Sequence, residues 1–299
     1  MGESFESVTE SRNQRSAHID RQTTGDILRA INAEDQQVAT IISKHIDVIE
    51  GIVQDAVRAL QKGGRLFYVG AGTSGRIGVL DASEIPPTYG TEPELVQAII
   101  AGGDQAIFEA VEGTEDNEEL GRDDLLERGV KETDVVIAIT ASGKAPYVIG
   151  ALKAAEELGA VTVSFTCNHH APLHAFAKHE LSIEVGPEIV MGSTRMKAGT
   201  AQKLVLNMIT TTTMIQLGKV YRNLMVDVKP LNKKLVSRSK RMIQYATDCS
   251  EERAEQLFHL SGQRPKIAIV MELLNVSETE AEQHLDREEG FVYRVLEEE

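Results

Sequence analysis

Two segments of this chain combine glycine with hydroxyl side chains, a composition that suits the binding of a phosphate. The first is Gly70-Ala-Gly-Thr-Ser-Gly-Arg76, and the second is Thr140-Ala-Ser-Gly-Lys-Ala145. Backbone N–H groups at the start of a helix attract anions, and Ser and Thr hydroxyls add further donors. The predicted phosphate-binding residues are Gly72, Thr73 and Ser74 in the first loop, and Thr140, Ser142, Gly143 and Lys144 in the second.

The glycine spacing of the first loop, G-x-G-x-x-G, is also that of dinucleotide-binding proteins. In those proteins an acid that follows the second strand holds the ribose. Here the corresponding apolar run continues into Gly102-Gly103, and Asp104 lies beyond it. A further alternative is that both loops are tight turns that need glycine for conformation only. Because two hydroxyl-rich loops occur in one chain, we favour a site for the terminal phosphate of a small molecule.

Short apolar runs that alternate with helical patterns must position these loops. The runs predicted to be buried strands are 65–69, 95–100, 135–140, 161–166 and 181–185. Alternation of this kind predicts an α/β fold with a five-stranded parallel sheet flanked by helices. Loops that follow such strands meet at the carboxyl edge of the sheet, where ligands bind.

Helical patterns precede and follow the predicted sheet. One long amphipathic helix is expected from about residue 35 to 62, and another over 195–217. After Pro230 the chain is predicted to be helical, and Ser277 with Glu280 indicates a capping box. The predicted organisation is an N-terminal arm and helical lead-in at 1–56, an α/β domain at 57–228 and a small helical C-terminal domain at 229–299.

Composition argues against several classes of function. Of the 299 residues, 41% are hydrophobic and 26% charged, as in soluble globular proteins, and no apolar run approaches the length of about 18 residues that spans a membrane. The start of the chain lacks a signal peptide, and Cys167 and Cys249 are far apart, so we predict a cytoplasmic protein. The histidines show no metal-ligand spacing, and no metal site is expected.

The net charge of −15 disfavours nucleic-acid binding. Residues 229–241 contain six basic residues and no acid. We interpret this basic stretch as a solvated helix face or a subunit contact.

The two loops resemble those of the SIS (sugar isomerase) family. Within it, the chain resembles the N-acetylmuramic acid 6-phosphate etherases from about Thr9 to its C-terminus. The segments that carry this resemblance are Gly70–Gly90, Ala110–Asp116, Gly192–Lys203 and Asn223–Asp227. Ala145 stands where many SIS proteins have Thr or Ser, so one phosphate donor is absent from the second loop.

The resemblance implies a lyase that removes D-lactate from C3 of N-acetylmuramic acid 6-phosphate during peptidoglycan recycling. Opening of the sugar ring gives an aldehyde, which acidifies the proton at C2. Lactate then leaves by β-elimination, and water adds to the unsaturated aldehyde to give N-acetylglucosamine 6-phosphate. One base at C2 and one acid at the ether oxygen are sufficient. No cofactor is therefore expected.

The resemblance also implies two catalytic carboxylates. Glu84 precedes Pro86-Pro87, which are expected to end the helix that begins at the glycine loop. Near the negative end of a helix dipole, Glu84 is suited to protonate the departing lactate oxygen. Glu115 matches the second carboxylate and is expected to be the base at C2. By composition alone Glu115 is one surface acid among many, and only the resemblance distinguishes it.

The polar start of the predicted helix at 195–217 is a third candidate region. Its residues Ser193, Thr194, Arg195 and Lys197 are expected to bind the lactate carboxylate or sugar hydroxyls. Arg195 in particular has the fork of donors that suits a carboxylate. The alternative is an ordinary polar helix start without a ligand.

The position of Glu84 raises a question of distance. It lies about ten residues beyond the glycine loop, which is about 14 Å along a straight helix. That exceeds the span of a hexose between its C6 phosphate and C3. Either the helix breaks near Gly78, or Glu84 serves the phosphate loops of a neighbouring subunit. We favour a homodimer with composite sites, in which the long helices at 35–62 and 195–217 offer apolar contact surface.

Three other functions remain as alternatives. A non-catalytic sugar-phosphate-sensing regulatory protein, similar to the glucokinase regulatory protein, would have a second SIS unit and no need of paired acids. A sugar-responsive DNA-binding regulator would need a basic helix-turn-helix module, which residues 1–60 do not show. An aldose–ketose isomerase would use the same ring opening and C2 base, and the loops alone do not distinguish it.

Overall fold

The computed structural model describes residues 8–230 and 232–297. Residues 1–7 of the predicted arm, and 231 and 298–299 of the predicted C-terminal domain, lie outside this description. The chain forms two compact units, one made of residues up to 82 with 94–210, and the other of 83–93 with residues from 211 onward. In this division the N-terminal residues group with the sheet, and residues 211–228 group with the C-terminal residues. The three segments stay a prediction.

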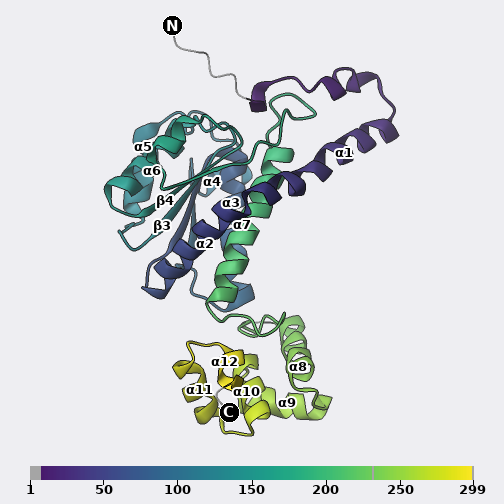
Figure 1. The fold of residues 1–299 in the computed structure, drawn as a ribbon, viewed down its shortest axis with the longest axis vertical. Coiled ribbons are helices and arrows are strands. Elements are labelled where there is room, and N and C mark those ends of the chain that lie inside the picture. The colour runs from purple at the N-terminus through teal and green to yellow at the C-terminus, as the bar shows by residue number, and fades with distance from the viewer. Residues whose placement is uncertain (1–7, 231, 298–299) are drawn as a thin grey trace. The chain divides into compact units, whose positions relative to one another are not determined.

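The first unit is built on a five-stranded parallel sheet with the order β2-β1-β3-β4-β5 (Figure 1). Its strands are β1 (Leu66–Gly70), β2 (Val96–Ile100), β3 (Val135–Ile139), β4 (Val161–Thr166) and β5 (His179–Ser182). All residues of β1 and β3 are buried, as expected when helices cover both faces of a parallel sheet. The predicted fold class is confirmed. The strand order reverses between β1 and β3, which is where ligands bind in open sheets of this kind.

The fifth strand lies earlier than predicted. The apolar run at 181–185 indicated a strand there, but pairing with β4 covers only His179–Ser182. Ile183 still donates its N–H to Thr166, the last residue of β4, at 2.9 Å. Ile183 and Val185 are buried beyond the end of β4, where no further partner residue exists for a ladder.

In the described part of the first unit, seven α-helices lie wholly or in part. They are α1 (Thr24–Ile42), α2 (Ile46–Gln61), α3 (Gly72–Tyr89), α4 (Gln105–Phe108), α5 (Glu118–Glu127), α6 (Pro146–Glu157) and α7 (Lys197–Gln216). Three short 3₁₀ helices between Val8 and Arg21 precede them. The single helix predicted at 35–62 is therefore two helices, separated by a 3₁₀ turn at Ser43–His45. The first begins upstream of the apolar pattern, because the Thr23 side chain caps it by accepting from the N–H of Asp26.

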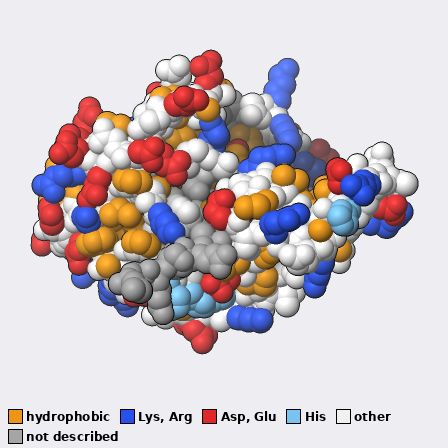
Figure 2. Space-filling model, turned by 90° about the horizontal axis from the view of Figure 1, so that it is seen from above, with side chains coloured by type: hydrophobic (Ala, Val, Ile, Leu, Met, Phe, Trp, Pro, Cys, Tyr) orange, Lys and Arg blue, Asp and Glu red, His pale blue; other side chains and the backbone are white. Residues whose placement is uncertain are grey.

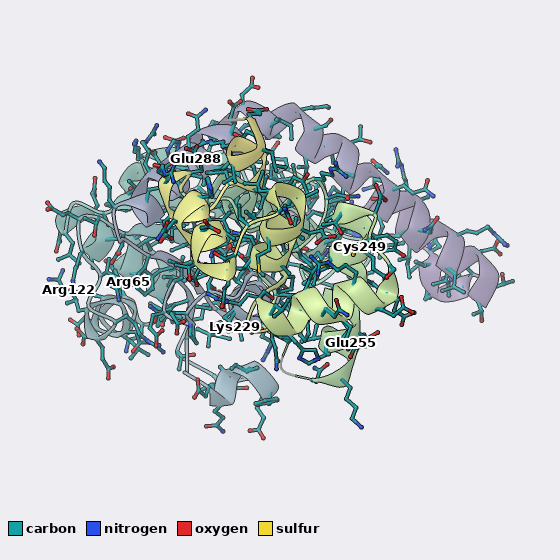
Figure 3. The ribbon with its side chains drawn as sticks, turned by 90° about the horizontal axis from the view of Figure 1, so that it is seen from below. Arg65, Arg122, Lys229, Cys249, Glu255 and Glu288 are labelled. Carbon is teal, nitrogen blue, oxygen red and sulfur yellow. The ribbon has the colours of Figure 1, made fainter. Side chains whose placement is uncertain are left out.

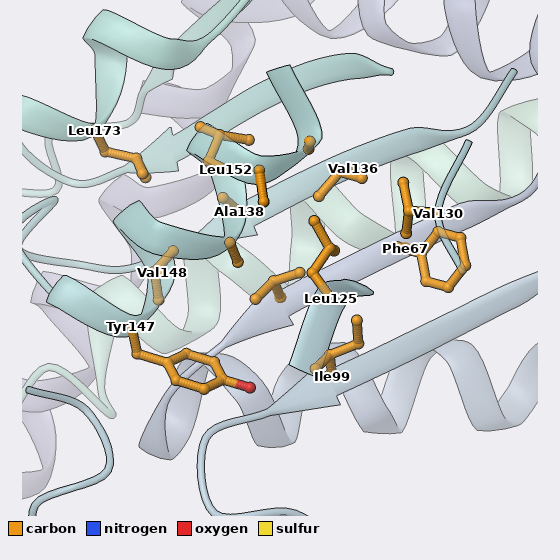
Figure 4. Close-up of a cluster of buried hydrophobic side chains, with 14 of the residues drawn as sticks. Phe67, Ile99, Leu125, Val130, Val136, Ala138, Tyr147, Val148, Leu152 and Leu173 are labelled. Atoms are coloured by element: carbon orange, nitrogen blue, oxygen red, sulfur yellow. The ribbon is translucent and has the colours of Figure 1, made fainter. Parts of the chain in front are cut away.

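Alternate strand residues pack on opposite faces of the sheet. Phe67 and Val136 belong to a buried cluster with residues of α5 and α6 (Figure 4). Tyr68, on the other face, contacts α3, where a Cβ added to Gly78 would lie 3.0 Å from the Cβ of Tyr68. The core thus holds α3 and α6, the helices that follow the two predicted phosphate loops, on opposite faces of the sheet.

The second unit is a group of helices around a buried helix α10. These helices are α8 (Lys233–Thr247), α9 (Glu251–Leu260), α10 (Pro265–Leu274), α11 (Glu278–Arg287) and α12 (Val292–Glu297). Figure 3 shows them with Cys249 at the connection between α8 and α9 and Glu255 on α9. The predicted capping box is present, since Ser277 and Glu280 each bond to the other's backbone N–H. Every residue from Pro265 to Met271 is buried, so α10 is the core of this unit.

The surface carries both signs of charge. On the face drawn in Figure 2, acidic and basic side chains are interspersed and hydrophobic side chains form patches between them. Within the described parts of the chain, no helix has both the length and the apolar character needed to cross a membrane.

Candidate active site

The first predicted phosphate loop connects β1 to α3. A Cβ added at Gly70 would lie 2.7 Å from the N atom of Gly75, and one added at Gly75 would lie 2.5 Å from Cγ1 of Ile100. Gly72 has a φ of +53°, in the left-handed region. Because α3 begins at Gly72, Thr73 and Ser74 lie in its first turn, where backbone N–H groups have no acceptor within the helix. The loop therefore presents N–H groups together with two hydroxyls.

The second predicted loop connects β3 to α6 and holds its hydroxyls close together. Oγ1 of Thr140 and Oγ of Ser142 lie 3.3 Å apart, and the N–H of Lys144 donates to the Ser142 oxygen at 3.2 Å. Gly143 has a φ of +74°, and a Cβ there would lie 2.2 Å from the Cβ of Ala171. The structure therefore excludes any larger residue at this turn.

The sheet brings the two loops together. Gly70, the last residue of β1, is the register partner of Ile139, the last residue of β3. Both loops thus leave the sheet side by side at its carboxyl edge, at the point where the strand order reverses. This is the arrangement needed for both loops to contact one phosphate.

Glu115 is attached to the helix that follows the second loop. The backbone N–H of Tyr147, in the first turn of α6, donates to the carbonyl oxygen of Glu115 at 3.0 Å. The side chain is exposed, yet partial burial of its carboxyl, and secondly the neighbouring Asp116 carboxylate, raise the pKa of Glu115. A carboxylate with a raised pKa is a stronger base, which suits the predicted role.

Glu84 lies within α3 and is exposed. The prediction that Pro86-Pro87 end this helix was wrong, because α3 continues to Tyr89. Proline has a helical φ and keeps its carbonyl acceptor, and the N–H of Gly90 donates to the Pro86 oxygen at 2.9 Å. The helix ends at Gly90, which has a φ of +66°. Glu84 is therefore not at the helix end, and the dipole argument for its role does not apply.

The third candidate segment lies against the first loop. A Cβ added to Gly199, in the first turn of α7, would be 3.5 Å from Cγ2 of Thr73. The preceding residues Ser193 and Thr194 are half-buried and Arg195 is exposed. Arg195 is thus the exposed cation of this segment. It lies just before α7, whose first turn is close to the first loop.

Lys197 has a different environment from the one predicted. Its ammonium is buried and donates to Oε2 of Glu34, on α1, at 2.6 Å. The buried carboxylate of Glu188 accepts from the backbone N–H groups of Lys197 and Ala198 and so caps α7. Burial, as the largest effect, raises the pKa of Glu188. In this structure Lys197 ties the start of α7 to α1, and its ammonium is not brought to the loops.

Comparison with known proteins identifies the family. Residues 48–156 match the model described as the glucokinase regulatory protein N-terminal SIS domain, and residues 121–212 match the SIS domain. The N-acetylmuramic acid 6-phosphate etherase 2 of Lactiplantibacillus plantarum is 52% identical, over 97% of this chain and 98% of its own. The N-acetylmuramic acid 6-phosphate etherase of Clostridioides difficile is 50% identical, over 97% and 95%. This chain belongs to the N-acetylmuramic acid 6-phosphate etherase family.

Solved structures support the fold of this etherase-family chain. A phosphoheptose isomerase from Francisella tularensis aligns with a TM-score of 0.51 at 18% identity, over 65% of this chain and 100% of its own. The phosphoheptose isomerase from Neisseria gonorrhoeae aligns with a TM-score of 0.50 at 17% identity, over 64% and 98%. At such low identity these likenesses concern the fold alone.

Sequence reasoning missed Asn168, which supports the second loop. It is buried two residues after the end of β4, and its Nδ2 donates to the carbonyl oxygen of Ala141 at 2.8 Å. Its Oδ1 accepts from the N–H of Val8 at 2.8 Å. A polar side chain at the end of a buried strand was the available signal.

Asp81 is a second missed residue and fixes the orientation of α3. Its carboxylate is buried and accepts from the Tyr68 hydroxyl at 2.8 Å, Asn207 Nδ2 at 2.6 Å and Thr210 Oγ1 at 3.2 Å. These bonds tie α3 to β1 and α7 one helical turn before Glu84. Burial, and secondly Asp81, raise the pKa of Tyr68 well above its ordinary value, so the hydroxyl remains a donor.

Replacing Asp81 by asparagine is expected to lower the free energy of unfolding by about 1–3 kcal/mol. An amide has one acceptor oxygen, and its NH₂ group would face donors. Asp123→Asn, at an exposed position on α5, is the matched control and should change stability by less than about 0.5 kcal/mol. Urea denaturation measures both. Equal stability of the two variants would show that the Asp81 network contributes little.

Within the described residues, no group of three or more His, Cys, Asp or Glu side chains is placed to hold a metal ion.

Proposed function

We propose that this chain cleaves the lactyl ether of N-acetylmuramic acid 6-phosphate and releases D-lactate and N-acetylglucosamine 6-phosphate. The observation that carries the proposal is the identity of about half of all residues with etherases along nearly the whole chain. The two hydroxyl loops at one edge of the sheet, and the presence of Glu84 and Glu115, support it.

In the proposed reaction, the loop hydroxyls and helix N–H groups hold the sugar phosphate while the ring opens to the aldehyde. Glu115 removes the C2 proton, the C3–O bond breaks, and Glu84 protonates the departing lactate oxygen. The same two groups exchange roles when water adds to C3. Arg195 is proposed to bind the lactate carboxylate, with Ser193 and Thr194 near the sugar hydroxyls.

We also propose a homodimer in which Glu84 completes the site of the neighbouring subunit. The helix break near Gly78 that would have avoided this is absent, because α3 is uninterrupted from Gly72 to Tyr89. From Ser74 to Glu84 is a rise of about 15 Å along a straight helix. Because this rise exceeds the span of a hexose between its C6 phosphate and C3, it supports the proposal that Glu84 serves a neighbouring subunit.

We place the reaction in the cytoplasm. Cys167 and Cys249 are both free, and Cys167 is buried, which fits a reducing compartment. The match of residues 48–156 to the glucokinase regulatory protein model keeps a sugar-phosphate sensor as a second candidate.

Incubation with N-acetylmuramic acid 6-phosphate tests the proposed function. We expect stoichiometric release of D-lactate, with deuterium at C2 of the product in heavy water. In ¹⁸O-labelled water the label should enter the sugar at C3 and be absent from lactate, because the C3–O bond breaks. Binding without lactate release would favour the sensor, and exchange of the C2 proton without loss of the lactyl group would favour an isomerase.

The rate should depend on the ionisation of Glu115. The base must be deprotonated, so kcat/KM should fall as pH decreases through the raised pKa of this carboxyl, at a higher pH than for an ordinary glutamate. Asp116→Asn removes one cause of the shift and should move this limb of the pH profile to lower pH. Glu112→Gln, an exposed neighbour, should leave it in place. A profile that neither variant changes would argue against Glu115 as the base.

A further inference from the structure

A cavity of about 310 Å³, open to solvent, is lined by residues of the second unit. It is lined by the end of α3 at Tyr89-Gly90, by Lys219, by residues 226–230 and by the start of α10 at residues 263–267. Part of this lining comes from the segment Asn223–Asp227, which carried the family resemblance and has no part in the proposed reaction. None of the residues assigned to the reaction lines the cavity.

The lining of the cavity is rich in basic side chains, most of which are paired with an acid. Lys219, Lys229, Arg264 and Lys266 line it, and Asp227 is its one acidic residue. The acids that pair with Lys229 and Arg264 are Glu92, Glu278 and Glu282, and these are not part of the lining. Lys229 is labelled in Figure 3, and about half of its side chain is exposed.

One carboxylate faces two ammonium groups among the lining residues. Oδ2 of Asp227 lies 2.7 Å from Nζ of Lys266 and 3.2 Å from Nζ of Lys219. Lys266 is buried and also donates to the carbonyl oxygen of Gly218 at 2.7 Å. The ammonium of Lys266 therefore donates to protein groups. Lys219 is less buried, and its ammonium has further N–H donors that a ligand can accept from.

The start of α10 adds to the positive potential. Helix α10 has ten residues, and no side chain caps its N-terminus at Arg264. Pro265 has no N–H, so the backbone donors of this terminus that lack a helical acceptor are those of Lys266 and Ile267, both in the lining. The positive end of the helix dipole lies at this terminus.

We propose that this cavity binds a small phosphate-bearing anion, with Lys219 and the first N–H groups of α10 as its donors. Lys219 and Lys266 share the single carboxylate of Asp227, so one positive charge there is left for an anion. The oxygens of a phosphate match donors from a helix terminus and an ammonium. Asp227 holds Lys219 and Lys266 in place and, as the like charge, limits the affinity. Free phosphate and the phosphate group of a metabolite share this chemistry.

Thermal unfolding in inorganic phosphate, against chloride at equal ionic strength, tests the proposal. The background is the double variant Ser74→Ala, Ser142→Ala, in which the two loops are weakened as phosphate sites. We expect phosphate to raise the melting temperature in this background. Lys219→Gln should weaken the apparent affinity about tenfold, whereas Asp227→Asn should strengthen it.

Lys131→Gln, an exposed lysine in the first unit, is the control and should leave the phosphate response unchanged. If Lys219→Gln weakens and Asp227→Asn strengthens the apparent phosphate affinity, the effects are on binding. A loss of structure would instead weaken the affinity in both variants. If Asp227→Asn does not fold, the comparison of Lys219→Gln with Lys131→Gln still decides. An equal phosphate response in those two variants would overturn the proposal.

A crystal soaked in selenate locates the anion directly. The proposal expects an anomalous peak within hydrogen-bond distance of Nζ of Lys219, and peaks confined to other places would overturn it. A second soak with glucose 6-phosphate distinguishes a metabolite site, which would show the sugar as well, from a site for free phosphate. Neither result depends on lactate release, so this proposal and the proposed function can fail separately.

Discussion

Replacing Glu84 by glutamine is expected to reduce the rate of lactate release by about 10²–10⁴-fold. Glutamine keeps the shape of the side chain but has no acidic proton to give to the ether oxygen. Binding of N-acetylglucosamine 6-phosphate, measured by calorimetry, should remain near that of the unaltered protein. Glu127→Gln, at an exposed position on α5, is the control and should retain full activity.

Isotope exchange separates the roles of the two carboxylates. In heavy water, the Glu84→Gln variant should still exchange the C2 proton of the product sugar, because Glu115 is intact. Glu115→Gln should lose this exchange together with lactate release. If Glu84→Gln loses exchange and Glu115→Gln keeps it, the assignment of acid and base is reversed. Lactate release at the normal rate by Glu84→Gln would exclude it as the acid.

Mixing two inactive variants is expected to restore activity. In a dimer with composite sites, Glu84→Ala supplies intact loops and the Ser74→Ala, Ser142→Ala variant supplies an intact Glu84. An equal mixture gives half heterodimers, each with one of its two sites intact, so about one quarter of the normal activity should return after refolding.

The mixing experiment requires proof that heterodimers form. Different affinity tags on the two variants allow the mixed species to be purified and assayed alone, where half of the normal activity is expected. A purified heterodimer as inactive as its parents would show that each subunit uses its own Glu84. A chain that stays monomeric at assay concentration would contradict the dimer itself.

Local sequence patterns were sufficient for four of the five strands and for the glycine turns. Strands β1, β3 and β4 are short runs bounded by turns and are buried on both faces, and β2 is a similar run that is partly exposed. The glycines of the first loop are set by backbone geometry, so their spacing alone predicted the turn. The capping box at Ser277 and Glu280 also depends only on neighbouring residues.

Element ends and polar partners depended on the tertiary structure. The end of α3 could not be predicted from Pro86-Pro87. The two prolines lack backbone N–H donors but keep a helical φ, so the helix continues to Tyr89 and ends before Gly90. The end of β5 depended on where its partner strand β4 ended.

The candidate site divides in the same way between sequence and structure. The hydroxyl loops were predictable because each is a continuous segment after a strand, and parallel strands bring such segments together. The environments of Lys197 and Asp81 were not predictable from the sequence. Lys197 pairs with Glu34 and Asp81 with Asn207, and these partners are distant in sequence and come together only when the helices pack. Spacing within one segment carries information about backbone conformation, whereas the pairing of buried charges is decided by the packing of the whole chain.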